Sequence, residues 1–112
     1  MTQTITQYNP GVRTNFAAGA ILDTGTVAAM KITLGWKPRY VRILNVTGLV
    51  VEEWVEGMSD ANGFLGIDSG AGAVDYSLIT SNGITPADDG FTIGLNTDVL
   101  VSSEQLHWVA FG

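Results

Sequence analysis

The sequence contains no cysteine, few charged residues, no basic residue beyond Arg42 and no long hydrophobic run. Without cysteine, neither a disulfide framework nor a thiolate metal site can form. The absence of thiols is compatible with folding in a reducing cytoplasm. These absences exclude disulfide-stapled secreted domains and cysteine-ligated zinc modules.

Membrane and secretion signals are also missing. The first ten residues, MTQTITQYNP, have neither the basic region nor the apolar segment of a signal peptide. No apolar run approaches the roughly 18 residues that a transmembrane helix needs. We therefore expect no membrane partner.

Charged residues make up only 14% of the chain, whereas about a quarter is usual. The surface must then consist largely of Thr, Ser, Asn, Gly and apolar groups. Such a surface suits a protein that works packed against a partner, but a glycine-rich all-β monomer has a similar composition. Both interpretations stay open.

The charges that are present are segregated along the chain. Residues 1–42 carry all five basic residues against Asp23 alone, whereas residues 43–112 carry ten acids and no Lys or Arg. The overall charge of −6 argues against sequence-independent nucleic-acid binding, which needs a basic surface. Either the two halves pair within one fold, or a basic edge meets an acidic edge between subunits.

The stretch from Trp36 to Gly57 predicts a β-hairpin whose arms carry opposite charge. Two strand-forming runs, 39–47 and 49–55, are separated by Gly48. Apolar and polar residues alternate in the first run, so one face of a sheet should carry Val41, Ile43 and Asn45, and the other Tyr40, Leu44 and Val46.

The remaining pattern indicates an all-β protein with one core, as a chain of 112 residues allows. The glycine-rich stretch 57–72 is expected to form turns and short strands, since glycine weakens regular elements. No segment has helical periodicity, and the connections are too short for βαβ crossovers. About seven or eight strands predict a jelly-roll-like antiparallel β-sandwich. Besides the hairpin, strands are expected at Thr26–Leu34, Ala73–Thr80, Phe91–Leu95, Val99–Ser102 and Gln105–Phe111, with Ser81–Gly83 as a tight turn.

The first 24 residues lack clear periodicity, and we interpret them as an extended N-terminal arm ahead of a sandwich domain at 25–112. Tyr8 lies in a turn signature with Pro10 and Gly11. Tyr8, Arg13 and Phe16 are candidate contacts of this arm with a partner. A partly disordered terminus is the alternative.

Several residues invite a site interpretation. Asp60 and Asn62 do not follow the spacing of a calcium loop and are better explained as an Asx turn. Glu52, Glu53 and Glu56 could supply carboxylates for glycoside hydrolysis, but a solvated edge or cross-strand pairing with Arg39 and Arg42 explains them better, because neither needs a special function. His107, the single histidine, has no recognisable triad around it. The three tryptophans, Trp36, Trp54 and Trp108, suit a core, a protein interface or a sugar platform.

Several segments resemble the small capsid decoration proteins, also called cement or staple proteins, of tailed double-stranded DNA phages. The resemblance covers roughly residues 30–112 and leaves the arm outside. The segments that carry it are Gly35–Asn45 (GWKPRYVRILN), Glu53-Trp54, Gly57-Met58, Gly83–Thr85 (GIT), Gly90–Gly94 (GFTIG) and His107–Phe111 (HWVAF).

The resemblance implies a non-enzymatic virion protein, made in the host cytoplasm, that binds the outer surface of the major capsid shell. Its expected partners are the major capsid protein and further copies of itself, as a dimer in preference to a trimer. It implies no cofactor. Two alternatives stay open: a tail or fibre module that binds host glycans through exposed tryptophans, and a hydrolase. The candidate partner-binding residues are Tyr8, Arg13, Phe16, Arg39, Arg42, Glu52, Glu53 and Glu56.

Overall fold

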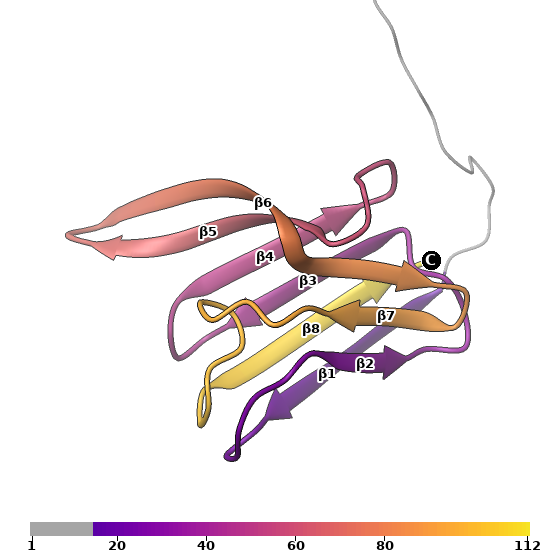
Figure 1. Cartoon of the computed structure of the whole chain (residues 1–112), viewed down its shortest axis with the longest axis horizontal. Coiled ribbons are helices and arrows are strands. Elements are labelled where there is room, and N and C mark those ends of the chain that lie inside the picture. Colours follow the sequence, from indigo (N-terminus) through magenta and orange to yellow (C-terminus); the bar gives the residue numbers. More distant parts are fainter. Residues whose placement is uncertain (1–14) are drawn as a thin grey trace, which may run out of the picture.

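A computed structural model describes residues 15–112, which form one curled sheet of eight strands and contain no helix (Figure 1). All neighbouring strands are antiparallel, in the order β1-β8-β3-β4-β5-β6-β7-β2. The strands are β1 (Phe16–Leu22), β2 (Met30–Thr33), β3 (Tyr40–Asn45), β4 (Val50–Val55), β5 (Asn62–Gly70), β6 (Ala73–Ala87), β7 (Gly90–Ile93) and β8 (Gln105–Phe111).

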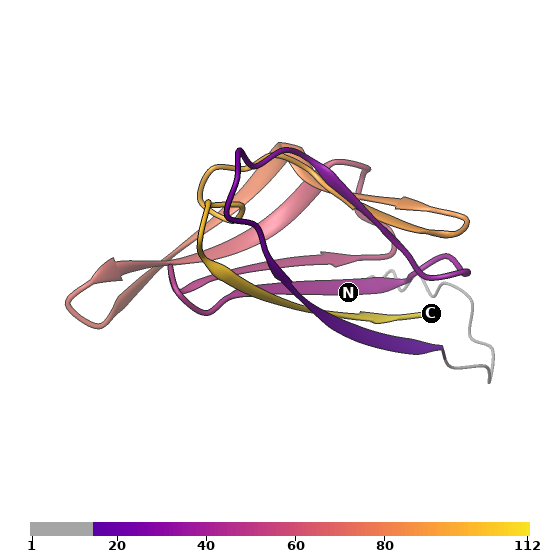
Figure 2. The same cartoon turned by 90° about the horizontal axis from the view of Figure 1, so that it is seen from below.

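The sheet curls over so that its two halves face each other like the layers of a sandwich (Figure 2). Strands β1, β8, β3 and β4 form one layer, and the end of β6 with β7 and β2 forms the other. This confirms the predicted all-β, sandwich-like fold. The jelly-roll topology is not confirmed, because β3 to β7 follow one another as a simple meander, whereas a jelly roll is built from two Greek keys.

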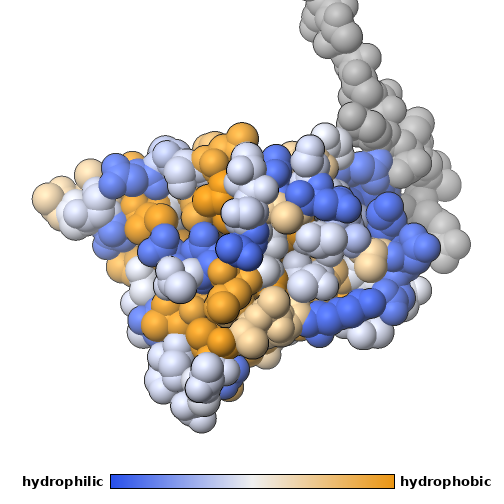
Figure 3. Space-filling model, viewed as in Figure 1, coloured by the Kyte–Doolittle hydropathy of each residue, from blue (hydrophilic) through white to orange (hydrophobic). Residues whose placement is uncertain are grey.

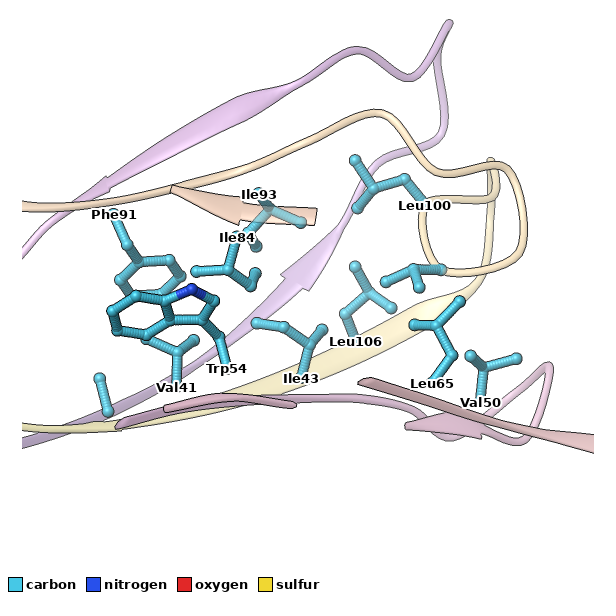
Figure 4. Packing of buried hydrophobic residues seen from close by; sticks show 12 residues of the cluster. Val41, Ile43, Val50, Trp54, Leu65, Ile84, Phe91, Ile93, Leu100 and Leu106 are labelled. Atoms are coloured by element: carbon cyan, nitrogen blue, oxygen red, sulfur yellow. The ribbon is translucent and has the colours of Figure 1, made fainter. Parts of the chain in front are cut away.

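The core lies between the two layers (Figure 4). Along the strands that form the two layers, every second side chain points inward, as the pleat requires. The predicted faces of β3 are confirmed: Val41, Ile43 and Asn45 are buried, while Arg42 is exposed. Each large apolar side chain buried here contributes roughly 1.5–3 kcal/mol to folding. The buried apolar residues are Val41, Ile43, Val50, Trp54, Leu65, Ile84, Phe91, Ile93, Val99, Leu100, Leu106 and Ala110.

The turn between β3 and β4 forms differently from the prediction. Gly48 does separate the strands, but the left-handed residue is Leu49, with φ of 59°. Asn45 organises the turn, because its Oδ1 accepts hydrogen bonds from the backbone N–H groups of Thr47 (3.1 Å) and Gly48 (2.7 Å). Side-chain acceptance of this kind is typical of asparagine.

The expected tight turn at Ser81–Gly83 is wrong, because β6 runs through these residues. Asn82 adopts φ of 58°, and the register with β5 jumps here: Gly63 pairs with Ile79, whereas Asn62 pairs with Ile84. The chain therefore bends at a bulge and passes from one layer to the other (Figure 2). Asn82 has a left-handed backbone, and Gly83 lies where a Cβ would collide with the backbone of Asn62. Both features are common in tight turns, but the chain does not reverse its direction here.

The domain boundary at residue 24 also needs correction. Residues Phe16–Leu22 are strand β1, which pairs with β8 along its whole length. Gly19 permits this pairing, since a Cβ there would lie 2.6 Å from the Trp108 indole. This part of the expected arm belongs to the sheet, while residues 1–14 lie outside the described residues.

Three other predicted strands are shorter or absent, among them Phe91–Leu95, which ends at Ile93, whereas the strand predicted at Ala73–Thr80 continues to Ala87. Residues 26–29 are not in a strand, so only Met30–Thr33 of the expected run pairs, with β7. No strand forms at 99–102, because this segment lies in two turns: the N–H groups of Val99 and Leu100 bond to the carbonyl of Asn96, and the N–H of Glu104 bonds to the carbonyl of Val101. The glycine-rich stretch instead supplies β5, nine residues long.

The bend in β6 yields a stability prediction. A Cβ at Gly83 would collide with the backbone carbonyl of Asn62, which cannot move without opening the β5–β6 ladder. We expect Gly83→Ala to lower the free energy of unfolding by about 2 kcal/mol or more, the cost of overpacking a rigid site. Urea denaturation measures it. Gly25→Ala is the matched control, because its nearest neighbour atom would lie at 3.5 Å; equal stability of the two variants would contradict the account.

Candidate functional site

The outer face of the curled sheet carries an unusual amount of exposed apolar surface. Side chains that alternate with the core residues point to solvent, and many of them are large and hydrophobic; Tyr76 is the most exposed at 69%. Figure 3 shows hydrophobic surface over the β5–β6 hairpin and over the segment that follows β7. The exposed large apolar residues are Phe16, Leu22, Val46, Leu49, Val55, Phe64, Val74, Tyr76, Leu78, Leu95 and Phe111.

A groove of about 380 Å³ lies within this surface, across β3, β4, β5 and β6, and we call it the outer groove. A second depression, also of about 380 Å³, shares Glu53 and Phe64 with it, and a third, of about 300 Å³, shares Leu49 and Val51. The three depressions therefore adjoin one another along the outer face. The outer groove is lined by Arg42, Leu49, Val51, Glu53, Phe64, Gly66, Asp68, Val74 and Tyr76.

A stacked aromatic pair forms one wall of the outer groove. The rings of Phe64 and Tyr76 lie 5.8 Å apart with their planes at 17°. Gly66 is directly opposite Tyr76, and a Cβ there would lie 3.3 Å from the tyrosine ring. The glycine therefore lets the ring lie flat across β5, where it offers a rigid apolar contact.

The polar rim of the groove is held in place by the neighbouring strands. Arg42 of β3 lies opposite Glu53 of β4 in the ladder. The Tyr40 hydroxyl donates a 2.6 Å hydrogen bond to Oε2 of Glu53. Burial, and then the hydrogen bond and negative charge of Glu53, raise the pKa of Tyr40 to about 12, so this donor keeps its proton. The rim thus offers one fixed carboxylate and one exposed cation.

The predicted partner-binding residues do not all meet at this site. Tyr8 and Arg13 lie outside the described residues. Phe16 is exposed on β1 and packs on Phe111 at 5.1 Å, away from the groove. Arg39 donates to the carbonyl of Gly112 at 2.8 Å and so secures the C-terminal strand.

Glutamates 52, 53 and 56 are dispersed. Glu53 lines the groove, whereas the backbone N–H of Glu56 bonds to the carbonyl of Arg39 just past β4. Glu52 points the other way, into the core. Since Glu52 and Glu53 lie on opposite faces of the sheet, they do not form a carboxylate pair around one substrate.

Glu52 lies in an environment that is unusual for a carboxyl group. It is fully buried, lies between Ile43 and Leu65 in the ladder, and neither of its carboxylate oxygens has a hydrogen-bond partner among the described residues. Burial raises the pKa of Glu52 to about 7. Gly63 leaves the room that this side chain occupies, since a Cβ there would lie 2.8 Å from Oε2.

The other candidate sites take structural roles. Asp60 precedes Ala61, which has φ of 64° in the turn before β5. Trp54 is only 3% exposed, and Trp36 and Trp108 pack against the core. Within residues 15–112, no group of three or more His, Asp or Glu side chains is placed to hold a metal ion. The same residues include no helix able to span a membrane.

Most of the residues that line the groove are not among the binding residues predicted from the sequence. The sequence pattern predicts only strands or turns, and no binding role, for Leu49, Phe64, Val74 and Tyr76. The usable signal was alternation: in the run from Val74 to Leu78, the even positions are all large and apolar. The odd positions Asp75 and Ser77 are exposed as well, so neither face of this part of β6 is covered by another layer of the described residues.

Comparison with protein-family models, with curated proteins and with solved structures found no match. Any function must therefore be argued from the residues and surfaces of this chain.

Glu52 yields a pH prediction. A carboxyl group whose pKa is higher in the folded state stabilises the fold below its unfolded pKa, and this contribution is lost as pH rises through the folded value. Because the pKa rises from its ordinary value of 4.5 to about 7, the stabilisation that is lost amounts to roughly 3 kcal/mol, at ~1.4 kcal/mol per pH unit. We expect the stability of the wild type to fall relative to Glu52→Gln between pH 5 and 8. Urea denaturation at several pH values measures the free energy of unfolding of both proteins. If the difference between them did not change with pH, the interpretation of Glu52 as a buried carboxyl group without a hydrogen-bond partner would be contradicted.

Proposed function

We propose that this protein is a capsid decoration protein of a tailed phage, a non-enzymatic binder of the outer surface of the major capsid shell. The observation that carries the proposal is the set of three adjoining, mainly apolar depressions on the outer face, with the outer groove at their centre. A surface of this kind on a small folded domain marks an interaction site, because exposed apolar area is stabilised by burial against a partner.

The chemistry of the groove suits a protein partner. Its middle is apolar and aromatic, from Leu49, Phe64 and Tyr76, and its rim carries Arg42, Glu53 and Asp68. Protein interfaces commonly combine an aromatic centre with a polar rim. The low overall charge of the chain fits the same role, since few residues need to stay solvated when the surface is covered.

The choice of a capsid as the partner is supported by the resemblance of residues 30–112 to phage decoration proteins. Such a protein acts mechanically. Each copy that binds the assembled shell, and not its dissociated subunits, lowers the free energy of the assembled state by mass action. No catalytic group is required for that role, and the separation of Glu52 from Glu53 agrees with it.

The glycan-binding alternative has less support. It was based on exposed tryptophans, and the three indoles pack in or against the core. The Phe64–Tyr76 pair would be the remaining aromatic platform for a sugar ring. A glycan array with the purified protein distinguishes the two proposals.

Binding to the shell can be tested with two substitutions in the groove. Leu49→Asn removes an apolar side chain, and asparagine tolerates the left-handed backbone at this position, with φ of 59°. Phe64→Thr removes half of the aromatic wall and keeps a residue suited to a strand. Because truncated interface anchors cost about 2 kcal/mol or more, we expect the double variant to bind expanded shells at least tenfold more weakly in co-sedimentation.

Asp98→Asn is the matched control, since Asp98 is exposed in the turn after β7 and outside the groove. It should bind as the wild type does. Circular dichroism and urea denaturation confirm that both variants fold. Wild-type affinity in a folded double variant would overturn the groove as the attachment site.

A further inference from the structure

The first half of β6 has a free edge. On one side, residues 73–79 pair with β5, but β7 covers the other side only from Ile84 to Ala87. Among residues 15–112, no strand bonds to the outer edge of residues 73–81. This part of the β5–β6 hairpin projects beyond the rest of the molecule (Figures 1 and 2).

Within the described residues, no segment covers the faces of the projecting strand or the side of it that points away from β5. Of residues 73–81, all but Ile79 are exposed, on both faces of the hairpin. Edge strands are normally protected by Lys, Pro, bulges or a covering loop. This edge contains no proline and one charge, Asp75. Its unpaired N–H and C=O groups therefore form a template for another extended strand.

The free edge is regular over a defined length. Gly72, with φ of 77°, precedes it, and Asn82, with φ of 58°, ends it, so the extended stretch is Ala73–Ser81. Ser77 is its midpoint. Two copies of such a strand pair antiparallel over their full length only when a two-fold axis passes beside Ser77.

That register is also the one that the side chains favour. Residues directly opposite in an antiparallel pair share a face. With Ser77 at the axis, Tyr76 of one copy lies opposite Leu78 of the other, and Val74 lies opposite Thr80. Asp75 lies opposite Ile79, four positions from its own counterpart, so the two carboxylates do not meet.

We propose that two copies of this chain join through residues 73–81 of β6, in an antiparallel, isologous pairing about Ser77. The two sheets become one, and the outer faces of both copies lie on the same side of it. Val74 and Tyr76 line the outer groove, so the two grooves meet at the seam and form one doubled apolar surface. This inference concerns self-association and holds whether or not the partner is a capsid.

Cysteine cross-linking tests the pairing, because the chain has no cysteine of its own. Opposed Cα atoms in an antiparallel pair lie ~4.5 or ~5.5 Å apart, within the span of a disulfide of ~4.4–6.8 Å. We expect Ser77→Cys to form a disulfide-linked dimer under mild oxidation. The wild type should have a mass of about 24 kDa by light scattering, twice the 11.9 kDa of the chain.

A charge at the same position provides the opposite test. Ser77→Lys places two ammonium groups beside each other at the axis, and we expect it to weaken dimerisation at least tenfold. Ser102→Cys and Ser102→Lys are the matched controls, since Ser102 is exposed in the turn before β8. They should neither cross-link nor change the mass.

Three results would overturn the proposal. One is a wild-type protein that stays monomeric at 100 µM. The free edge of β6 would then be available to a strand of a different protein and not to a second copy of this chain. Another is a cross-link at Ala18→Cys on the edge strand β1 in place of Ser77→Cys. The third is a Ser77→Lys variant that folds and dimerises normally. Loss of shell binding by groove variants that still dimerise separates this inference from the proposed function.

Discussion

The bend of β6 at Asn82 and Gly83 is the constraint on which the rest of the structure depends. A meander of strands buries nothing by itself, because each face of a flat sheet stays open to water. At this bend β6 leaves β5 and crosses to the opposite layer, where β7 and β2 cover the inner face of β3, β4 and β8. Three backbone hydrogen bonds hold it: Gly83 to Ala61, Ala61 to Ile84, and Gly94 to Gly83. The same bend leaves the first half of β6 projecting, with a free edge.

The curl divides the sheet into two chemically different faces. The inner face is almost wholly apolar, and its two buried polar side chains are Asn45 and Glu52; among residues 15–112, the Glu52 carboxyl group has no hydrogen-bond partner to offset its burial. The outer face, which in a monomer would be polar, carries the apolar hollow between β3 and β6. Both departures from the usual pattern cost the isolated domain stability or solubility. The proposed attachment role accounts for the apolar outer face.

The alternation of apolar and polar residues along a single strand can be predicted from the sequence, whereas the pairing of strands with one another cannot. The faces of β3 and β8 follow from period-two patterning, and the absence of helical periodicity predicts the all-β class. Alternation also put Glu52 in line with Val50 and Trp54, but acidic residues are so rarely buried unpaired that solvent or arginine was the expected partner. Asn82 and Gly83 have the composition of a hairpin turn, and only the pairing of Asn62 with Ile84 distinguishes a bend from a reversal. The groove arises from residues of four strands, so no local pattern could indicate it.

The proposed attachment of this protein to a capsid through its outer face can be tested directly by electron microscopy of expanded phage shells incubated with it. We expect discrete density on the outside of the shell, fitted by the domain with Phe64 and Tyr76 facing the capsid surface and the β7–β2 layer facing solvent. Density with the opposite orientation, or bare shells at saturating protein, would contradict the account.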